Sequence, residues 1–313
     1  MQTSQKPIPQ HLQDFLDWLD IERGLSSKSQ ENYARFLKKF FDWLKKNKLQ
    51  GLKPHELTPD HIWNYRLFLS RAESLKKSTQ NYYLIALRSL LSYFTEKDIS
   101  SLPSDKVKLA REKEERQVRF LTLEQLEKFF SAPDTSTFRG LRDRAILETL
   151  FSTGLRIAEL IGLNQEQIKI PQGEEELEVS LKGKGGRIRT VYFSQRTLQW
   201  LSQYLKARND NHDALFITYL SEKKKTGAHR ITPRAIQTMF QRYVVKTGIP
   251  LSTTPHVMRH TFATDLLTQG VDIRTLQEFL GHKSITATQI YAHVTSQKLR
   301  EIHQKFHSGK NLK

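Results

Sequence analysis

The sequence predicts a mainly helical protein of two domains: an all-helical N-terminal domain, then a mixed, mostly helical domain with a small antiparallel sheet. Three observations support this. Apolar residues recur at helical spacing through most of the 313 residues. In one stretch, apolar and polar residues alternate up to a glycine-rich turn. A highly charged segment separates two helical parts of the chain. We expect domain boundaries at 1–103 and 119–313, with a charged linker at 104–118.

Four helices account for the first domain. HLQDFLDWLDIER carries leucines and Phe15 on one face, and GLSSKSQENYARFLKKFFDWLKKNK repeats aromatic and leucine residues every three or four positions from Tyr33 to Leu44. TPDHIWNYRLFLSRA and KKSTQNYYLIALRSLLSYFTEK complete the set, and the last helix should open at Ser78 or Thr79. The segment PSDKVKLAREKEERQ then has too few apolar residues to form part of a core, which predicts the linker.

The second domain begins with the helical patterns TLEQLEKFFSA and FRGLRDRAILETLFSTGLRIAELIGL. In LEVSLKGKGGRIRTVYF, Leu177, Val179 and Leu181 alternate up to a glycine-rich turn, and residues typical of strands follow it, which predicts a hairpin with Lys184 at the tip. From Ile231 onward the pattern is helical again. One helix should run from Asp272 to a capping glycine, Gly281, and a short following helix should carry Tyr291. The basic tail after it has an apolar stripe and predicts a C-terminal helix.

The charge balance indicates a polyanionic partner. Fifty Lys and Arg residues face 33 Asp and Glu residues, a formal net charge of +17, and nucleic acid is the commonest such partner. The chain has no cysteine, which excludes disulfides, thiolate metal sites and a cysteine nucleophile. It has no secretory signal pattern and no apolar run of about 18 residues, so we expect a cytoplasmic protein.

Five basic residues are candidates for contacts with DNA phosphates. Basic residues on a helix surface usually only face solvent. In a chain with so large an excess of positive charge, binding to DNA phosphates is a serious alternative. The candidates are Lys38, Lys39, Lys76, Lys77 and Arg234.

The stretch HVMRH at 256–260 allows three interpretations: a metal site, a phosphate site or part of a core. His256 and His260 share one face of a helix, as in the H-E-x-x-H zinc motif, but the glutamate of that motif is missing. Arg259 would repel a metal dication, whereas its guanidinium would form two parallel hydrogen bonds to a phosphate. The stretch alone leaves the three interpretations open, and the rest of the chain has to decide between them. We expect no metal or other cofactor.

Four separated pieces, read together, indicate a family. STGLRIAEL contains Arg156, KGKGGR contains Lys184, HVMRH contains His256 and Arg259, and LGHKSITATQIYAHV contains His282 and Tyr291. In this order they resemble the site-specific tyrosine recombinases of the phage integrase family, and most closely the Xer branch that resolves chromosome dimers. The resemblance covers almost the whole chain. It implies a core-binding first domain, which binds DNA, and a catalytic second domain.

The resemblance also implies roles around a DNA phosphodiester. Tyr291 would attack the phosphorus and hold the 3′ phosphate covalently. Arg156 and Arg259 would bind the non-bridging oxygens, and His256 and His282 would donate further hydrogen bonds to them.

Three more residues receive roles from the same resemblance. Lys184 would protonate the departing 5′ oxygen. Glu159 would orient its neighbours, and His260 would support the site from outside the reacting atoms.

The chemistry of these side chains agrees with such roles. A phosphodiester gains charge on its equatorial oxygens during displacement, and arginine forks fixed on helices stabilise that charge. A tyrosine hydroxyl with a pKa near 10 is a weak nucleophile until cations favour the phenolate. A lysine near two arginines loses its proton more readily than in water, which suits it to act as an acid.

Several alternatives stay open at this stage. Each residue taken singly has a plain structural interpretation, such as a surface arginine, a core histidine or a packed tyrosine. At the level of function the alternatives are a mobile-element integrase or transposase of the same family, a DNA-binding relative without catalysis, and a type IB topoisomerase. The leading expectation is a homo-tetramer on two synapsed DNA sites, or a hetero-tetramer with a related recombinase.

Overall fold

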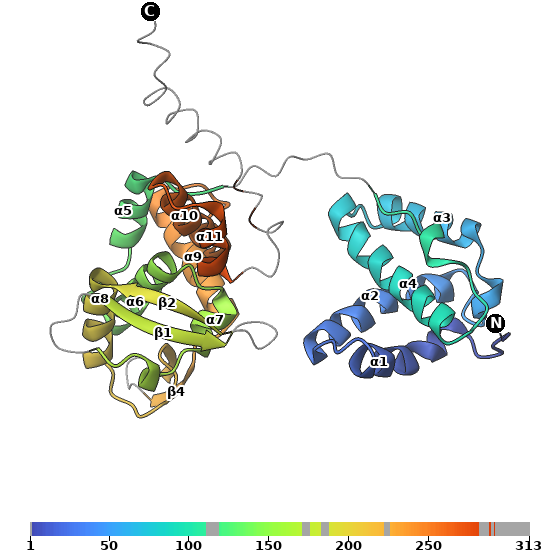
Figure 1. Cartoon of the computed structure of the whole chain (residues 1–313), viewed down its shortest axis with the longest axis horizontal. Coiled ribbons are helices and arrows are strands. Elements are labelled where there is room, and N and C mark those ends of the chain that lie inside the picture. The colour runs from blue at the N-terminus through green and yellow to red at the C-terminus, as the bar shows by residue number, and fades with distance from the viewer. Residues whose placement is uncertain are drawn as a thin grey trace, which may run out of the picture. The chain divides into compact units, whose positions relative to one another are not determined.

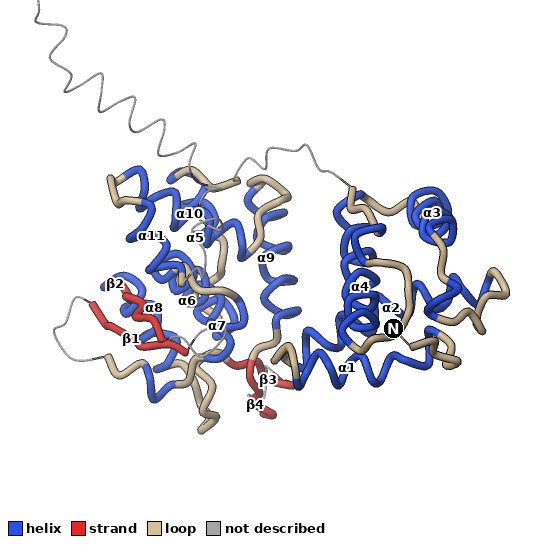
Figure 2. The backbone as a smooth tube through the Cα atoms, turned by 45° about the vertical axis from the view of Figure 1, so that its right-hand side comes forward, coloured by secondary structure: helices blue, strands red, loops and turns tan. Residues whose placement is uncertain are grey.

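The computed structural model describes residues 2–110, 119–170, 176–182, 188–221 and 226–281, together with 288 and 291. Contacts divide the chain into two compact units, Met1–Glu115 and Arg116–Lys313. Both units are built mainly from helices, and the short strands all belong to the second (Figures 1 and 2).

In the described residues, the first unit contains four α-helices and several short helical turns. In chain order its elements are η1 (Ile8–His11), α1 (Leu12–Ile21), α2 (Ser27–Lys46), η2 (Pro54–Glu56), α3 (Pro59–Leu67), η3 (Phe68–Ala72), α4 (Lys77–Glu96) and η4 (Ser104–Lys106). The four expected helices are all present. The last begins at Lys77, one residue before the expected start at Ser78.

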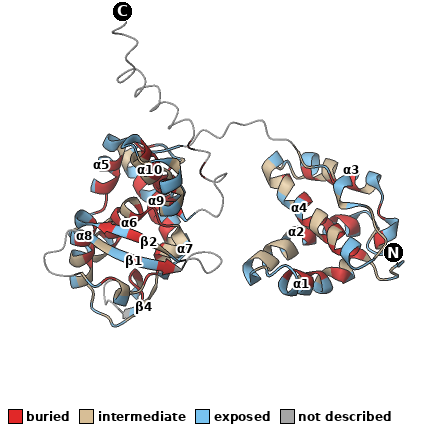
Figure 3. Ribbon diagram, viewed as in Figure 1, coloured by how far each residue is buried: buried red, intermediate tan, exposed pale blue. Residues whose placement is uncertain are grey.

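The core of the first unit follows the predicted helical spacing. Along α2, Leu37, Phe40 and Leu44 are buried, and Tyr33 and Phe36 pack against the same core. Lys38, Lys45 and Lys46 of this helix are exposed, and Figure 3 shows how buried and exposed residues are distributed along the ribbon. This amphipathic pattern is what stabilises a helix by tertiary packing.

Part of the segment that we expected to be linker packs on the first unit. Val107 is fully buried in its core, and Leu109 packs against that core. The Asn81 side chain exchanges two hydrogen bonds with the backbone of Ala110, of 2.9 and 3.0 Å. Residues 104–110 therefore belong physically to the first unit, and the functional division into DNA-binding domain, linker and catalytic domain remains a prediction.

The second unit has seven α-helices and two hairpins in the described residues. Its elements are α5 (Leu123–Ser131), α6 (Phe138–Thr153), α7 (Ile157–Gly162), η5 (Gln165–Gln167), β1 (Glu176–Lys182), β2 (Ile188–Ser194), α8 (Gln195–Lys206), β3 (Ile217–Ser221), β4 (Thr226–Arg230), α9 (Pro233–Thr247), α10 (Pro255–Thr268) and α11 (Ile273–Leu280). The C-terminal tail helix that we expected lies outside the described residues.

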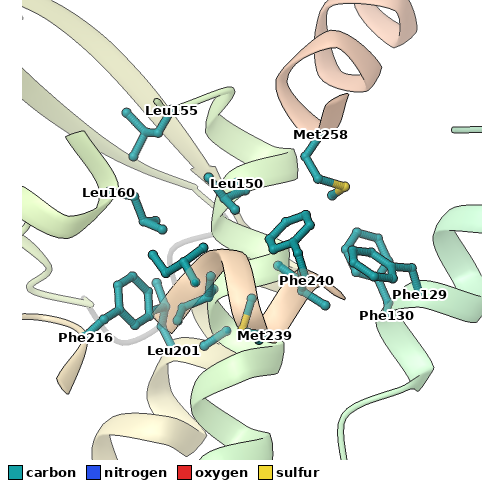
Figure 4. Packing of buried hydrophobic residues seen from close by; sticks show 14 of the residues in the cluster. Phe129, Phe130, Leu150, Leu155, Leu160, Leu201, Phe216, Met239, Phe240 and Met258 are labelled. Carbon is teal, nitrogen blue, oxygen red and sulfur yellow. The ribbon is translucent and has the colours of Figure 1, made fainter. Parts of the chain in front are cut away.

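Helices α6 and α10 are buried on most sides, because other helices and β2 pack around them. Figure 4 shows the core beside α6, where Leu150 lies near Phe240 of α9 and Met258 of α10. Even the acidic Asp143 of α6 is fully buried, and it is held by hydrogen bonds from Arg142, Arg242 and Tyr243. A buried carboxylate needs such partners. This rigid centre carries the residues of the candidate site.

The expected hairpin is present, and a second one was not expected. β1 and β2 pair antiparallel from Glu176↔Ser194 to Lys182↔Ile188, with Val179 and Val191 facing the core. β3 and β4 form a separate antiparallel pair. The sequence pattern from Ile217 to Tyr219 is short and followed by charged residues, so its strand signal was too weak to stand out.

None of the helices that the structure describes is both long and apolar enough to cross a membrane.

Candidate active site

Arg156 lies between two helices at a sharp change of chain direction. Helix α6 ends at Gly154, which adopts φ 59° and ψ 24°, a left-handed conformation that glycine accepts without strain. Arg156 is then the N-cap of α7, and Glu159 accepts a 2.8 Å hydrogen bond from its backbone N–H. The Arg156 guanidinium also donates to Glu159 over 2.9 Å, while 40% of its side chain stays exposed. This guanidinium can reach both its carboxylate and an external anion.

Glu159 has a second and more buried cationic partner. Arg189 of β2 donates from both terminal nitrogens to the two Glu159 oxygens, over 2.8 and 2.7 Å. Burial alone would raise the pKa of Glu159. The hydrogen bonds from Arg189 and Arg156 outweigh burial and hold the pKa at about 2. Glu159 is therefore an anion at any physiological pH.

Helix α10 presents the HVMRH residues in two directions. Thr254 caps the helix, and its side chain accepts a hydrogen bond from the backbone N–H of Val257. His256 is exposed, and the rings of His256 and His260 lie edge to face with centroids 4.4 Å apart. Burial, followed by the charges of Arg259 and Arg156, lowers the pKa of His256.

Arg259 is almost fully buried and joins the ends of two helices. Its guanidinium donates to the carbonyl of Gly154, at the end of α6, and to the carbonyl of Leu280, at the end of α11. These carbonyls have no partner within their own helices, and a cation suits the negative end of a helix dipole. Burial and the neighbouring charge of Arg156 lower the pKa of Arg259 to about 9. Arg259 is still a cation at neutral pH.

Tyr291 is buried, with 1% of its surface exposed, and packs with Leu267, Leu276 and Leu280. Its hydroxyl shares a 2.6 Å hydrogen bond with Nδ1 of His260. Burial raises the pKa of Tyr291 to about 12, although the charge of Arg259 opposes the shift. A tyrosine in this position is neutral and closed to solvent.

The structure thus brings most of the expected site residues into one region. Arg156 and Glu159 meet at the start of α7, and Arg259, His260 and Tyr291 meet around α10. Lys184 and His282 lie outside the described residues. No group of three acidic or histidine residues suited to a metal ion occurs in the described part of the chain.

The five candidate DNA contacts fall into two groups. Lys38, Lys76, Lys77 and Arg234 are exposed. Lys39 is half-buried and forms a 2.8 Å ion pair with Glu73.

Two features of the site were not predicted from the sequence. Arg189 was missed, although it shares the buried face of β2 with Val191 and Phe193, where a charged residue is unusual. His260 was expected to support the site from outside the reacting atoms, and its hydrogen bond to the Tyr291 hydroxyl was not foreseen.

Two family matches cover most of the chain. Residues 119–298 match the phage integrase family, and residues 12–98 match the N-terminal SAM-like domain of phage integrases. The first match alone spans more than half of the chain.

Curated relatives match nearly end to end. The tyrosine recombinase XerC of Pelotomaculum thermopropionicum is 33% identical, with 95% of this chain and 97% of the relative covered. The XerC of Natranaerobius thermophilus is 35% identical over 95% of this chain and 98% of its own. The XerD of Lacticaseibacillus casei is 31% identical over 94% and 97%.

Solved structures share the fold. The XerH site-specific recombinase bound to a palindromic difH substrate, a post-cleavage complex, has a TM-score of 0.72 at 21% identity, with 95% of this chain and 96% of that chain covered. The Tn1549 transposon integrase in complex with transposon right end DNA has a TM-score of 0.71 at 20% identity, with 94% and 98% covered. Fold, family match and full-length relatives agree: the chain belongs to the phage integrase family, in the branch of the Xer tyrosine recombinases.

Proposed function

We propose that this protein cleaves and rejoins DNA strands at a specific site, through a 3′-phosphotyrosine on Tyr291 and a Holliday junction. One observation carries this proposal. The hydroxyl of Tyr291 meets two residues of α10, His260 and the buried Arg259, and Arg156 nearby is open to solvent. That set can bind a phosphate and supply a nucleophile. We place the protein in the cytoplasm, where the chromosome lies.

The two arginines serve different parts of the phosphate chemistry. Arg156 is open to solvent and offers the guanidinium that binds a non-bridging oxygen. Arg259 is held at two helix ends and supplies a fixed positive charge beneath the same oxygens. His256, exposed next to them, donates a hydrogen bond when it is protonated or in the matching tautomer.

Two residues outside the described part of the chain complete the proposal. Lys184 protonates the 5′ oxygen as it leaves, and His282 donates to the phosphate. Both assignments come from the family pattern. The ladder of β1 and β2 supports the first, because its last described pair is Lys182↔Ile188 and Lys184 comes after it. No metal enters this mechanism, because the arginines and the lysine supply the positive charge.

The position of Tyr291 adds a step before cleavage. A DNA phosphate cannot reach the hydroxyl of a tyrosine that is 1% exposed as a whole. Tyr291 or the residues that cover it must therefore move before attack, and the hydrogen bond to His260 has to be exchanged. We infer that the structure represents a resting state in which the nucleophile is withheld.

The relatives favour a chromosomal role. Full-length identity of 31–35% to XerC and XerD proteins supports chromosome dimer resolution by a tetramer, formed by this chain alone or with a related recombinase. A mobile-element integrase of the same family is the second candidate, because the Tn1549 integrase shares the fold. The two differ in substrate: a chromosomal enzyme recombines two copies of one site, whereas an integrase joins unlike sites.

The exposed lysines of the first unit support a DNA-binding role for that unit. Lys38 on α2 and Lys76 and Lys77 at the start of α4 are exposed and form no ion pair with another described residue, so each can contact a DNA phosphate. Lys39 contributes less, because its ammonium is paired with Glu73. Arg234, near the start of α9, is the corresponding candidate in the second unit.

Covalent capture tests the proposal. A nicked suicide substrate that carries the recombination site traps the protein on DNA, and a denaturing gel detects the adduct. The wild type should form the adduct and Tyr291→Phe should not, while both bind DNA equally. Tyr192→Phe is the matched control, since it removes a half-exposed hydroxyl and keeps the ring contact with Phe279. An adduct with Tyr291→Phe would overturn the assignment of the nucleophile, and no adduct with the wild type would favour a binding-only relative.

A further inference from the structure

The Glu159 carboxylate is saturated by two arginines. It accepts from the Arg156 backbone over 2.8 Å, from the Arg156 guanidinium over 2.9 Å, and from Arg189 through two bonds of 2.8 and 2.7 Å. Four donors on two oxygens use all the lone pairs of a carboxylate. Glu159 therefore has one fixed orientation, and that orientation sets the position of Arg156.

The two arginines differ in burial. The Arg189 side chain is 9% exposed, Glu159 is 12% exposed, and Arg156 is 40% exposed. A phosphate can approach Arg156, whereas Arg189 lies behind the carboxylate. Arg189 is thus placed to act on the phosphate through its neighbours and not by touching it.

Gly281 makes room for Arg189. A Cβ at this position would lie 2.8 Å from Cδ of Arg189 and 3.1 Å from one of its terminal nitrogens. The Arg189 side chain therefore passes close to the backbone where α11 ends. The backbone of Arg189 is fixed in β2, and its side chain lies against Gly281. The guanidinium therefore has little freedom to turn.

The charges explain why a second arginine is needed. Glu159 with Arg156 alone would be a neutral pair, and the carboxylate could turn both oxygens onto the Arg156 fork, the geometry that arginine and carboxylate prefer. Arg189 occupies both Glu159 oxygens, and the three groups together carry a charge of +1. The remaining donors of Arg156 stay available for a phosphate.

We propose that Arg189 is a positioning residue of the cleavage reaction, which holds Glu159 and offsets its charge so that Arg156 keeps its own charge for the scissile phosphate. This inference rests on the proposed function. A wild-type protein that forms no covalent adduct would refute the proposed function, whereas an active wild type with the wrong variant pattern refutes only the role of Arg189.

Single-turnover cleavage of the suicide substrate tests the charge argument. Arg189→Met should slow cleavage about 10- to 100-fold. This decrease is somewhat smaller than the one caused by removing a donor that touches the reacting group. The double variant Arg189→Met with Glu159→Gln should cleave at least about tenfold faster than Arg189→Met alone. The amide keeps the cap on α7 and removes the uncompensated negative charge. A double variant no faster than Arg189→Met would overturn the proposal.

If Arg189 had only a structural role, its loss would affect stability and leave cleavage by the folded protein unchanged. Arg144→Met is the control, because it removes another mostly buried pair, Arg144 with Glu148 at 2.8 Å, in which Arg144 also lies over the rings of Phe130 and Trp200. It should lower the melting temperature and leave cleavage by the folded protein unchanged. If Arg189→Met does not fold, Arg189→Lys takes its place: it loses the two-nitrogen fork and keeps the positive charge, so, if charge is what matters, cleavage should stay within about tenfold of the wild type. A larger defect in a folded Arg189→Lys would contradict the role of charge.

A neutral phosphate provides the second readout. In a methylphosphonate substrate a methyl group replaces one non-bridging oxygen, so the scissile group carries no charge. The charge of Arg156 then matters less, and the ratio of wild-type to Arg189→Met rates should shrink to a few-fold. An equal ratio on both substrates would show that Arg189 acts on folding alone and would overturn the proposal.

Discussion

The phenolic oxygen of Tyr291 lies 2.6 Å from Nδ1 of His260 inside a closed apolar cluster. Burial in this cluster shifts the pKa of both groups. Burial raises the pKa of Tyr291 to about 12, and burial with the nearby His256 and Arg259 lowers the pKa of His260 to about 4. Near neutral pH both groups are uncharged, which suits a buried hydrogen bond and does not suit a phenolate about to attack phosphorus.

The low pKa of His260 predicts that the second unit loses stability in mild acid. An unfolded histidine titrates near 6.5 and His260 in the folded state near 4, so between these values the unfolded chain binds more protons. The contribution is complete above pH 6.5 and is lost as the pH falls toward 4. We expect a loss of about 2 kcal/mol over this window, after allowing for the partial exposure of the ring.

Hydrogen exchange of α10 measures this effect, because its peptides report opening of the second unit. Protection in the wild type should fall between pH 6.5 and 4 after correction for intrinsic exchange. His260→Gln keeps a hydrogen-bonding side chain and cannot be protonated, so its protection should depend less on pH. Equal slopes for the two proteins would show that another group causes the loss.

A second prediction concerns the left-handed glycines that end two helices. Gly154 has φ 59° and Gly248 has φ 67°, so alanine at either position should cost about 1 kcal/mol from backbone strain. A Cβ on Gly248 would meet nothing within 4 Å, but on Gly154 it would lie 2.4 Å from a ring carbon of Phe262. Gly154→Ala should therefore be the more destabilising by at least about 1 kcal/mol in chemical denaturation. Equal costs would mean that Phe262 moves away freely.

The sequence was most informative where structure is local. The helix from Asp272 to Gly281 was predicted with its capping glycine, because a left-handed glycine acts within one turn of the chain, and the structure adds that the Asp272 carboxylate caps the other end. The bond between Glu159 and Arg189 spans 30 residues, and no local pattern indicates which strand residue meets which helix. The burial of Tyr291 depends on packing between separate helices, and the spacing of a motif carries no information about it.

A third prediction addresses the metal question raised by HVMRH. Cleavage of the suicide substrate should be unchanged by excess EDTA, because Arg156 and Arg259 already supply positive charge at the phosphate. DNA binding measured in the same buffer is the control, since chelation also alters ionic strength. Cleavage that EDTA abolishes and magnesium restores, with binding unchanged, would revive a metal role for His256 and His260.

A fourth prediction separates Lys184 from its neighbour Lys182. Lys184→Ala should slow cleavage of normal DNA, and a 5′-bridging phosphorothiolate should restore the rate, because a thiolate leaves without a proton. Lys182 ends the paired part of β1, opposite Ile188, so Lys182→Ala should not show this rescue. Rescue of Lys182→Ala alone would move the acid to that residue.

The last prediction asks whether Arg259 is more than a clamp between helix ends. Its fork donates to the carbonyls of Gly154 and Leu280, and a single ammonium cannot reproduce both bonds along with a contact to phosphate. Arg259→Lys should therefore lower stability by about 2 kcal/mol and slow cleavage about 100- to 1,000-fold. Thermal melting and single-turnover cleavage measure the two effects.

Arg230 provides a matched control for this substitution. It also donates to two backbone carbonyls at the end of a helix, those of Ile161 and Leu163, over 2.6 and 3.0 Å, and to the side chain of Asn164. Arg230→Lys should cost similar stability, because it breaks the same kind of clamp, and cleavage by the folded fraction should stay at the wild-type rate. If the two variants slow cleavage by the same factor below their melting temperatures, Arg259 acts only by holding α6 and α11 together. If only Arg259→Lys slows it, the guanidinium acts on the phosphate as well, since loss of the clamp is common to both.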